Sequence, residues 1–180
     1  MSDGQKQNAG SRWHRWEPHI HAPGTILNDQ FKGDDPWEEY LNTLEEASPP
    51  IRAIGVTDYY RADSYLRMIK AKEQGRLEKC DLIFPNIEVR LAIGTVRVRW
   101  ANLHLLVSPE DPKHLDEISR ILAQLTFKAY DDTFSCREDD LIRLGKAVAK
   151  GVSDGGALVR GAEQFKVSFE QLKQVYNDSA

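Results

Sequence analysis

A His-x-His pair, His19 and His21, closes an alternating stretch that begins near Trp16 and is broken by Ala22-Pro23-Gly24. Residues i and i+2 of a strand point to the same face, so the two imidazoles can bind one ion together. Imidazole combined with carboxylate suits zinc, manganese or iron better than calcium. The pair alone is also compatible with a solvent-exposed strand edge, and the metal interpretation depends on ligands elsewhere in the chain.

Three further polar residues lie in or beside later apolar runs. Asp58 follows the run 51–57, Glu88 lies within 84–89, and His104 lies within 102–106. Burying such groups costs several kcal/mol unless something pairs with them, and a shared cation would explain all three at once. The predicted metal ligands are therefore His19, His21, Asp58, Glu88 and His104, with Asp58 and His104 also as catalytic candidates.

Two of these residues keep a second interpretation. Asp58 could equally be a turn or N-cap acid before the next helix. Glu88 could face solvent on an alternating strand, although the flanking Pro85 favours the site.

A metal centre of this composition predicts hydrolysis of a phosphate ester. A bound divalent ion lowers the pKa of water towards neutrality and neutralises charge on a phosphoryl group. Arg61 and Arg90 are the candidates for contacts with the substrate phosphate, because guanidinium forks match phosphate oxygens.

The elements that must position these residues alternate in type. We expect strands at 16–21, 51–57, 82–93, 96–100 and 103–107, and helices from Pro36, at 62–74, 112–125 and 138–150, and from a capping box at Ser168. Asp58 to Arg61 is expected to form the loop after the second strand. Helices between short apolar strands favour an α/β sheet with parallel pairing, whose ligands bind beyond the carboxyl ends of the strands.

Composition sets the outer limits. The chain has 180 residues, 41% of them hydrophobic and 29% charged, which fits one globular domain. Residues 1–12 read as a disordered lead-in. Cys80 and Cys136 are far apart without CxxC spacing, which favours a reducing cytoplasm. No apolar run approaches the roughly 18 residues that span a bilayer, so no membrane is expected. The net charge of -4 gives no bulk attraction to nucleic acid, although a local basic patch could still provide it.

Four motifs together resemble the PHP (polymerase and histidinol phosphatase) domain: Pro18-His19-Ile20-His21, Gly55-Val56-Thr57-Asp58, Asn86-Ile87-Glu88-Val89 and Leu103-His104-Leu105. The resemblance covers roughly residues 13 to 110. It implies a distorted seven-stranded β/α barrel with two or three divalent ions (Zn, Mn or Fe). It also implies that His19, His21, Glu88 and His104 are ligands and that Glu88 bridges two metals.

The segments 13–24, 37–41, 55–59 and 84–91 resemble more closely the N-terminal PHP module of large bacterial ATPases of the SMC or AAA-like type, sometimes called TrlF-like. This likeness implies a nuclease that cleaves nucleic acid phosphodiesters and acts with an ATPase domain or subunit in genome maintenance or anti-phage defence. A homo-oligomer is compatible with it.

Two departures from the family pattern qualify this expectation. Thr57-Asp58-Tyr59 replaces the usual Thr-Asp-His, and a phenol is normally protonated at neutral pH. No Asp-x-His follows His104, and His114 is the only later histidine. We therefore expect residues 13–180 to be the N-terminal part of a single PHP-like domain with an incomplete barrel. The alternatives are a catalytically incomplete module with a structural or interaction role, and a small-molecule phosphatase.

Overall fold

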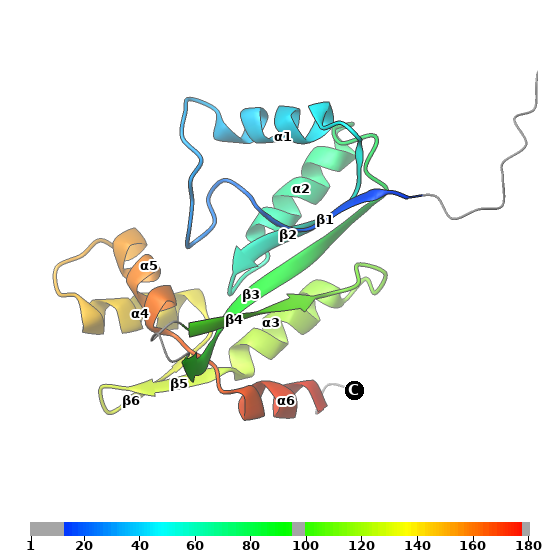
Figure 1. Ribbon diagram of the computed structural model, residues 1–180. Coiled ribbons are helices and arrows are strands. Elements are labelled where there is room, and N and C mark those ends of the chain that lie inside the picture. The colour runs from blue at the N-terminus through cyan, green and yellow to red at the C-terminus, as the bar shows by residue number, and fades with distance from the viewer. Residues whose placement is uncertain (1–12, 95–99, 178–180) are drawn as a thin grey trace, which may run out of the picture.

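The structure, a computed structural model, describes residues 13–94 and 100–177 and has mixed α/β architecture (Figure 1). Its strands are β1 (Arg15–His21), β2 (Ile51–Tyr59), β3 (Leu82–Gly94), β4 (Trp100–Leu106), β5 (Thr126–Ala129) and β6 (Asp132–Ser135). Its helices are α1 (Pro36–Glu46), α2 (Asp63–Glu73), α3 (His114–Gln124), α4 (Glu138–Val148), α5 (Asp154–Gln164) and α6 (Phe169–Asn177).

The main sheet has four strands in the order β1-β2-β3-β4 and curls into a half-barrel (Figure 1). β1 pairs with β2 and β2 with β3 in parallel, as the alternation of strands and helices predicts, whereas β4 pairs antiparallel to β3. A separate two-stranded sheet joins β5 and β6. The described residues thus confirm an α/β fold, but they do not by themselves contain a seven-stranded barrel.

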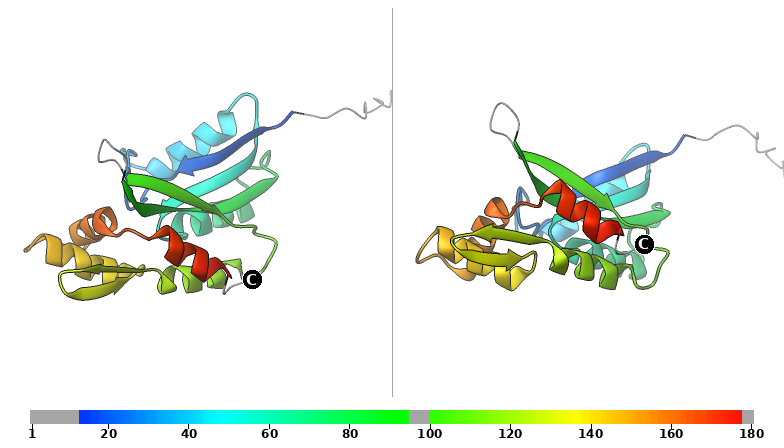
Figure 2. Two further views of the ribbon diagram at one scale, coloured as in Figure 1. Left: turned by 60° about the horizontal axis from the view of Figure 1, so that its bottom comes forward. Right: turned by 90° about the horizontal axis from the view of Figure 1, so that it is seen from below.

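Two hydrophobic cores pack against the sheet. Ile54, Val56 and Ile83 pack with side chains of α1 and α2, while Val89 and Leu91 of β3 pack with α3 to α6 and the β5–β6 hairpin. Figure 2 shows the same division, with the cyan helices beside β1 and β2 and the later helices beside the far half of β3. The odd-numbered residues of β3 supply both cores, so the even-numbered ones point to the opposite face.

Several local signals are confirmed. The Asp35 carboxylate accepts a hydrogen bond from the Glu38 backbone N–H at the start of α1. The Ser168 hydroxyl accepts one from the Gln171 backbone N–H at the start of α6. None of the helices among the described residues is long and apolar enough to cross a lipid bilayer.

Other elements differ from expectation. β2 continues through Asp58 and Tyr59, which were expected to begin a loop. Most of the strand predicted at 96–100 lies outside the described residues, and Trp100 instead begins β4. The β5–β6 hairpin and α5 are not among the elements expected from the sequence.

Candidate metal centre

Three donor atoms converge at the carboxyl ends of β1 and β2, beside the middle of β3. The Nε2 atoms of His19 and His21 lie 3.2 Å apart. From Oε2 of Glu88, the Nε2 atom of His21 is 3.4 Å away and that of His19 is 3.8 Å away. These three residues form the group that could hold a metal ion among the described residues. The structure thus brings together three of the five predicted ligands.

The geometry of this group fits a transition metal ion. Zinc–ligand bonds of about 2.0–2.1 Å in tetrahedral geometry place neighbouring donor atoms about 3.4 Å apart. The three measured separations, 3.2, 3.4 and 3.8 Å, lie close to that value. An ion at their centre would bind both imidazoles and one carboxylate oxygen.

The second sign of a cation is a buried oxygen without a partner. Glu88 is 3% exposed, and its Oε2 makes no hydrogen bond. The buried Nδ1 of His21 also has no hydrogen-bond partner. A buried carboxylate oxygen left in this way costs free energy that a bound cation would offset.

The other oxygen of Glu88 is fully engaged. Oε1 accepts a hydrogen bond from the Tyr59 hydroxyl at 2.8 Å and another from the Asn102 side-chain amide. The Asn28 amide donates in turn to the Tyr59 oxygen at 3.2 Å. This network fixes the carboxylate and leaves Oε2 alone to face the two histidines.

Tyr59 stays protonated and donates a hydrogen bond to Glu88. Burial, together with the hydrogen bond to Glu88, raises the pKa of the Tyr59 phenol far above its ordinary value. Its ring stacks on that of His21, with 5.7 Å between centroids. At the position where the family pattern has a histidine, this chain has a hydrogen-bond donor to Glu88.

The charge states suit metal binding at neutral pH. Burial by itself raises the pKa of Glu88, but polar contacts with His21 and Tyr59 outweigh it and hold the pKa below the ordinary range. Burial, together with the nearby His104, lowers the pKa of His19. Glu88 is therefore a carboxylate and His19 a neutral imidazole near pH 7, which are the forms that bind metal.

His104 borders this group from β4. Its ring centroid is 4.4 Å from that of His19, and its Nε2 is 4.0 Å from Oε1 of Glu88. The side chain is 30% exposed. His104 thus faces the centre from its open side, as a donor near the group rather than a member of it.

Asp58 lies apart from the group. It is 1% exposed, and its carboxylate oxygens accept hydrogen bonds from the next residue of β2, from neighbouring loops and from α2. The donors are Thr25, Ile26, Tyr59, Arg61 and Ser64. Because β2 continues through Asp58, alternation turns this side chain away from the face that Tyr59 shares with Glu88. Asp58 is therefore a buried acid satisfied by protein donors, and it is neither in a turn nor the N-cap of α2, which is Ala62.

The two predicted phosphate-binding arginines have structural partners. Arg61 donates to Asp58 and to the Gly24 carbonyl, and it also pairs with Asp63. Arg90 follows Glu88 by two residues, but its guanidinium donates to the Glu163 carbonyl at 3.0 Å. Both arginines tie segments of the fold together in this structure.

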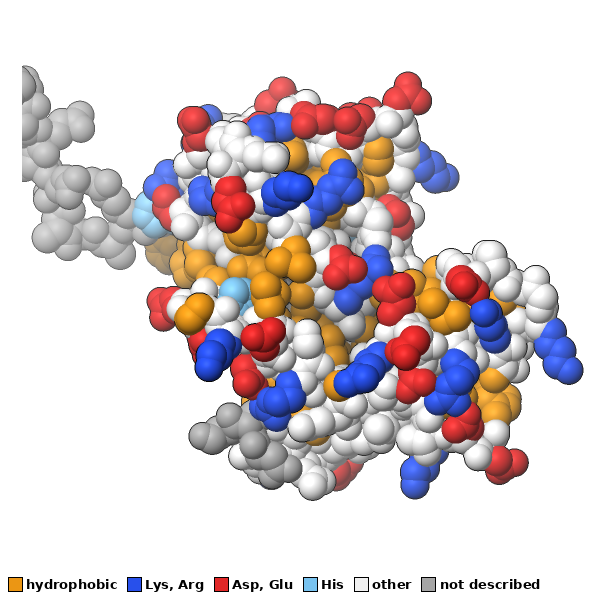
Figure 3. Space-filling view, turned by 180° about the vertical axis from the view of Figure 1, so that it is seen from behind, with side chains coloured by type: hydrophobic (Ala, Val, Ile, Leu, Met, Phe, Trp, Pro, Cys, Tyr) orange, Lys and Arg blue, Asp and Glu red, His pale blue; other side chains and the backbone are white. Residues whose placement is uncertain are grey.

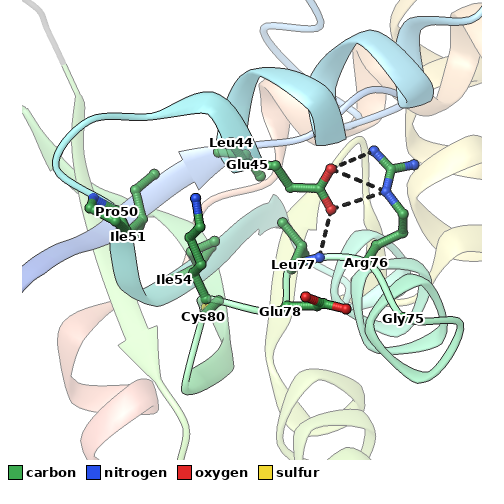
Figure 4. Close-up of a pocket in the computed structure, with 11 residues that line it drawn as sticks. Leu44, Glu45, Pro50, Ile51, Ile54, Gly75, Arg76, Leu77, Glu78 and Cys80 are labelled. Atoms are coloured by element: carbon green, nitrogen blue, oxygen red, sulfur yellow. Dashed lines mark hydrogen bonds and ion pairs between the residues drawn. The ribbon is translucent and has the colours of Figure 1, made fainter.

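A pocket of about 350 Å³ lies elsewhere, at the amino ends of β2 and β3 (Figure 4). Leu44, Ile51 and Ile54 line its wall, and a fork of contacts between Glu45 and Arg76 closes one side. Figure 4 shows Glu45 paired with Arg76 and with the Leu77 backbone, and none of the three residues of the candidate metal group lines this pocket.

Sequence reasoning missed the residues that orient the ligands. Asn86 and Asn102 stand two residues before Glu88 and His104, on the same strands and the same face. A polar side chain at i−2 of a buried ligand was the available signal.

Among known proteins, no family model, no curated protein and no solved structure matches the chain.

Proposed function

We propose that this chain binds a divalent transition metal ion through His19, His21 and Glu88 and hydrolyses phosphate esters, with nucleic acid phosphodiesters as the substrate class. The observation that carries the proposal is the buried Oε2 of Glu88, which makes no hydrogen bond and lies 3.4 and 3.8 Å from two imidazole nitrogens, at metal-ligand spacing. Three protein ligands with an open fourth position are typical of catalytic rather than structural zinc.

Each residue of the proposed site has a different role. An ion bound here supplies Lewis acidity and lowers the pKa of water. Tyr59 and Asn102 hold Glu88 in place, while His104 stands at the open side, where it can bind or accept a proton. His19 is 49% exposed, which supports access for a long substrate.

A second function has one specific observation in its favour. Oε1 of Glu88 is occupied by Tyr59 and Asn102, so the carboxylate is poorly placed to bridge two ions. A single-ion centre of this kind also suits a structural or interaction module within a larger assembly. Partners of such a module would include the ATPase that the PHP resemblance implies.

The test combines metal analysis with hydrolysis assays. Purified chain loaded with manganese or zinc should carry bound metal and cleave DNA, RNA or a generic phosphodiester. The His19→Ala, His21→Ala double variant should lose the metal and at least about 100-fold in activity, the scale on which removing electrostatic stabilisation acts. His14→Ala, which changes an exposed histidine just before β1, is the matched control and should behave as wild type.

Two results would contradict the proposal. Unchanged cleavage in the double variant would place the chemistry elsewhere. Bound metal without hydrolysis of any of these substrates would favour the structural module.

A further inference from the structure

Asn86 of β3 contacts both outer strands of the sheet, β4 beside it and β1 on the far side of β2. It is 1% exposed and lies in β3, beside Thr57 of β2. Its Nδ2 donates to the backbone carbonyl of Pro18 in β1 at 2.8 Å. Its Oδ1 lies 3.0 Å from Nδ1 of His104 in β4. One side chain therefore contacts both strands that bring histidines to the centre.

The direction of each hydrogen bond follows from the chemistry of the partners. The Pro18 carbonyl can only accept, so the amide nitrogen of Asn86 must face it. The amide oxygen then faces His104 and can itself only accept, so Nδ1 of His104 carries the hydrogen. A neutral imidazole has a single N–H, which leaves a lone pair on Nε2. That nitrogen is the one 4.0 Å from Glu88.

The Pro18 end of the bridge acts on His19. The pairing of β1 with β2 is irregular between Glu17 and Ile20, and the Pro18 carbonyl lies close over Gly55. A Cβ atom at Gly55 would sit 2.1 Å from the Pro18 oxygen, so only glycine leaves room for it. The hydrogen bond from Asn86 holds this carbonyl in place, directly before His19.

We propose that Asn86 is the positioning residue of the metal centre. Its amide holds the β1 irregularity that presents His19 and fixes His104 as the Nδ1–H tautomer, so that Nε2 of each ring faces the ion. The ring centroids of His19 and His104 lie 4.4 Å apart. This makes His104 the fourth protein donor or a proton acceptor at the open side. The effect on metal affinity rests on the proposed function, whereas the tautomer does not.

The first measurement needs no variant. Side-chain ¹⁵N NMR of the metal-free chain at mildly alkaline pH distinguishes the two imidazole tautomers. His104 should show a protonated Nδ1 and an unprotonated Nε2. The opposite tautomer, or a free mixture of the two, would overturn the proposal.

Two substitutions separate the two ends of the bridge. Asn86→Leu removes both hydrogen bonds, so His104 should lose its fixed tautomer and zinc affinity should fall about 10- to 100-fold. Asn86→Asp keeps the acceptor for His104 but cannot donate to Pro18, so the Nδ1–H tautomer should remain. Thr57→Val is the matched control, since the hydroxyl of this buried neighbour bonds, among the described residues, only to the Gly55 carbonyl. It should change neither readout.

The outcomes keep this proposal apart from the proposed function. Zinc binding by wild type with an unchanged tautomer and affinity in Asn86→Leu would overturn the role of Asn86 alone. A wild-type chain that binds no zinc would overturn the proposed function, and the tautomer spectrum would still decide the role of Asn86. If Asn86→Leu does not fold, wild type and Asn86→Asp supply the decision.

Discussion

At the scale of single residues, the two oxygens of the Glu88 carboxylate have different surroundings. Oε1 of Glu88 is satisfied by Tyr59 and Asn102, while Oε2 is buried without a hydrogen bond. Proteins keep such unsatisfied groups where function requires them, at a cost to stability. The charge of Glu88 should therefore matter more for metal binding than for the stability of the metal-free fold.

Replacing Glu88 by glutamine tests this difference between metal binding and stability. The amide oxygen of Glu88→Gln can accept from Tyr59 and Asn102, and its NH₂ group can donate to His21. The metal-free variant should lose no more than about 1 kcal/mol of stability, because the amide keeps the hydrogen bonds from Tyr59 and Asn102 while the charge that the fold favours is lost. At 100 times the dissociation constant, metal should stabilise wild type by about 2.7 kcal/mol and the variant hardly at all. Denaturant unfolding with and without zinc measures both effects. Equal stabilisation of the two proteins would mean that Glu88 is not a ligand.

The members of the candidate metal centre could be predicted from local patterns. His19 and His21 form an i, i+2 pair at the end of a strand and Glu88 is a polar residue inside an apolar run, and the structure brings the three together. Asp58 carried the same signal, but it is buried for another reason, since four donors from loops and α2 and the backbone N–H of Tyr59 surround it. A sequence pattern shows that a polar group is buried, but tertiary structure decides what satisfies it.

At the scale of elements, periodicity located the four strands of the main sheet and most helices but missed the β5–β6 hairpin and α5. That helix contains Gly155, Gly156 and Gly161, and glycine disfavours helices by about 1 kcal/mol each. The contacts explain one of them. A Cβ atom on Gly161 would lie 1.8 Å from the Leu141 carbonyl oxygen of α4. Close packing against α4 stabilises α5, and a contact between two helices cannot be predicted from the sequence of one of them.

The same packing predicts an unusual response to alanine. Gly145 of α4 faces α5, and a Cβ there would lie 1.8 Å from the Ala157 carbonyl oxygen. Gly145→Ala should lower the free energy of unfolding by about 1–3 kcal/mol despite the higher helix propensity of alanine. Gly155→Ala, which meets nothing within 4 Å, is the control and should be neutral or slightly stabilising. Thermal or urea unfolding of both variants decides. A stabilised Gly145→Ala variant would show that the two helices are not in this contact.

At the scale of the whole molecule, the net charge is -4. On the face seen from behind, Figure 3 shows acidic and basic side chains interspersed rather than one basic surface. Under the proposed function, a cation bound at the candidate metal centre would supply positive charge for recognition of a nucleic acid phosphate. Local titration there should shape the pH dependence of the whole fold.

Acid should destabilise the chain in two steps. The pKa of His19 is lowered from 6.5, so the unfolded chain takes up this proton first, and stability should fall as pH drops below 6.5. The pKa of Glu88 is lowered from 4.5, so its contribution, present above pH 4.5, is lost as pH falls through its folded value. Urea unfolding across this range measures the curve. His19→Gln should flatten the first step alone, and a stability that rises on acidification would contradict these assignments.

Anomalous X-ray scattering at the zinc edge from metal-loaded crystals would locate a bound ion. An anomalous peak is expected about 2.0–2.2 Å from Nε2 of His19, Nε2 of His21 and Oε2 of Glu88. The peak should vanish in Glu88→Gln crystals grown in the same way. A zinc peak bound elsewhere on the chain, or no peak in the loaded wild type, would contradict the account.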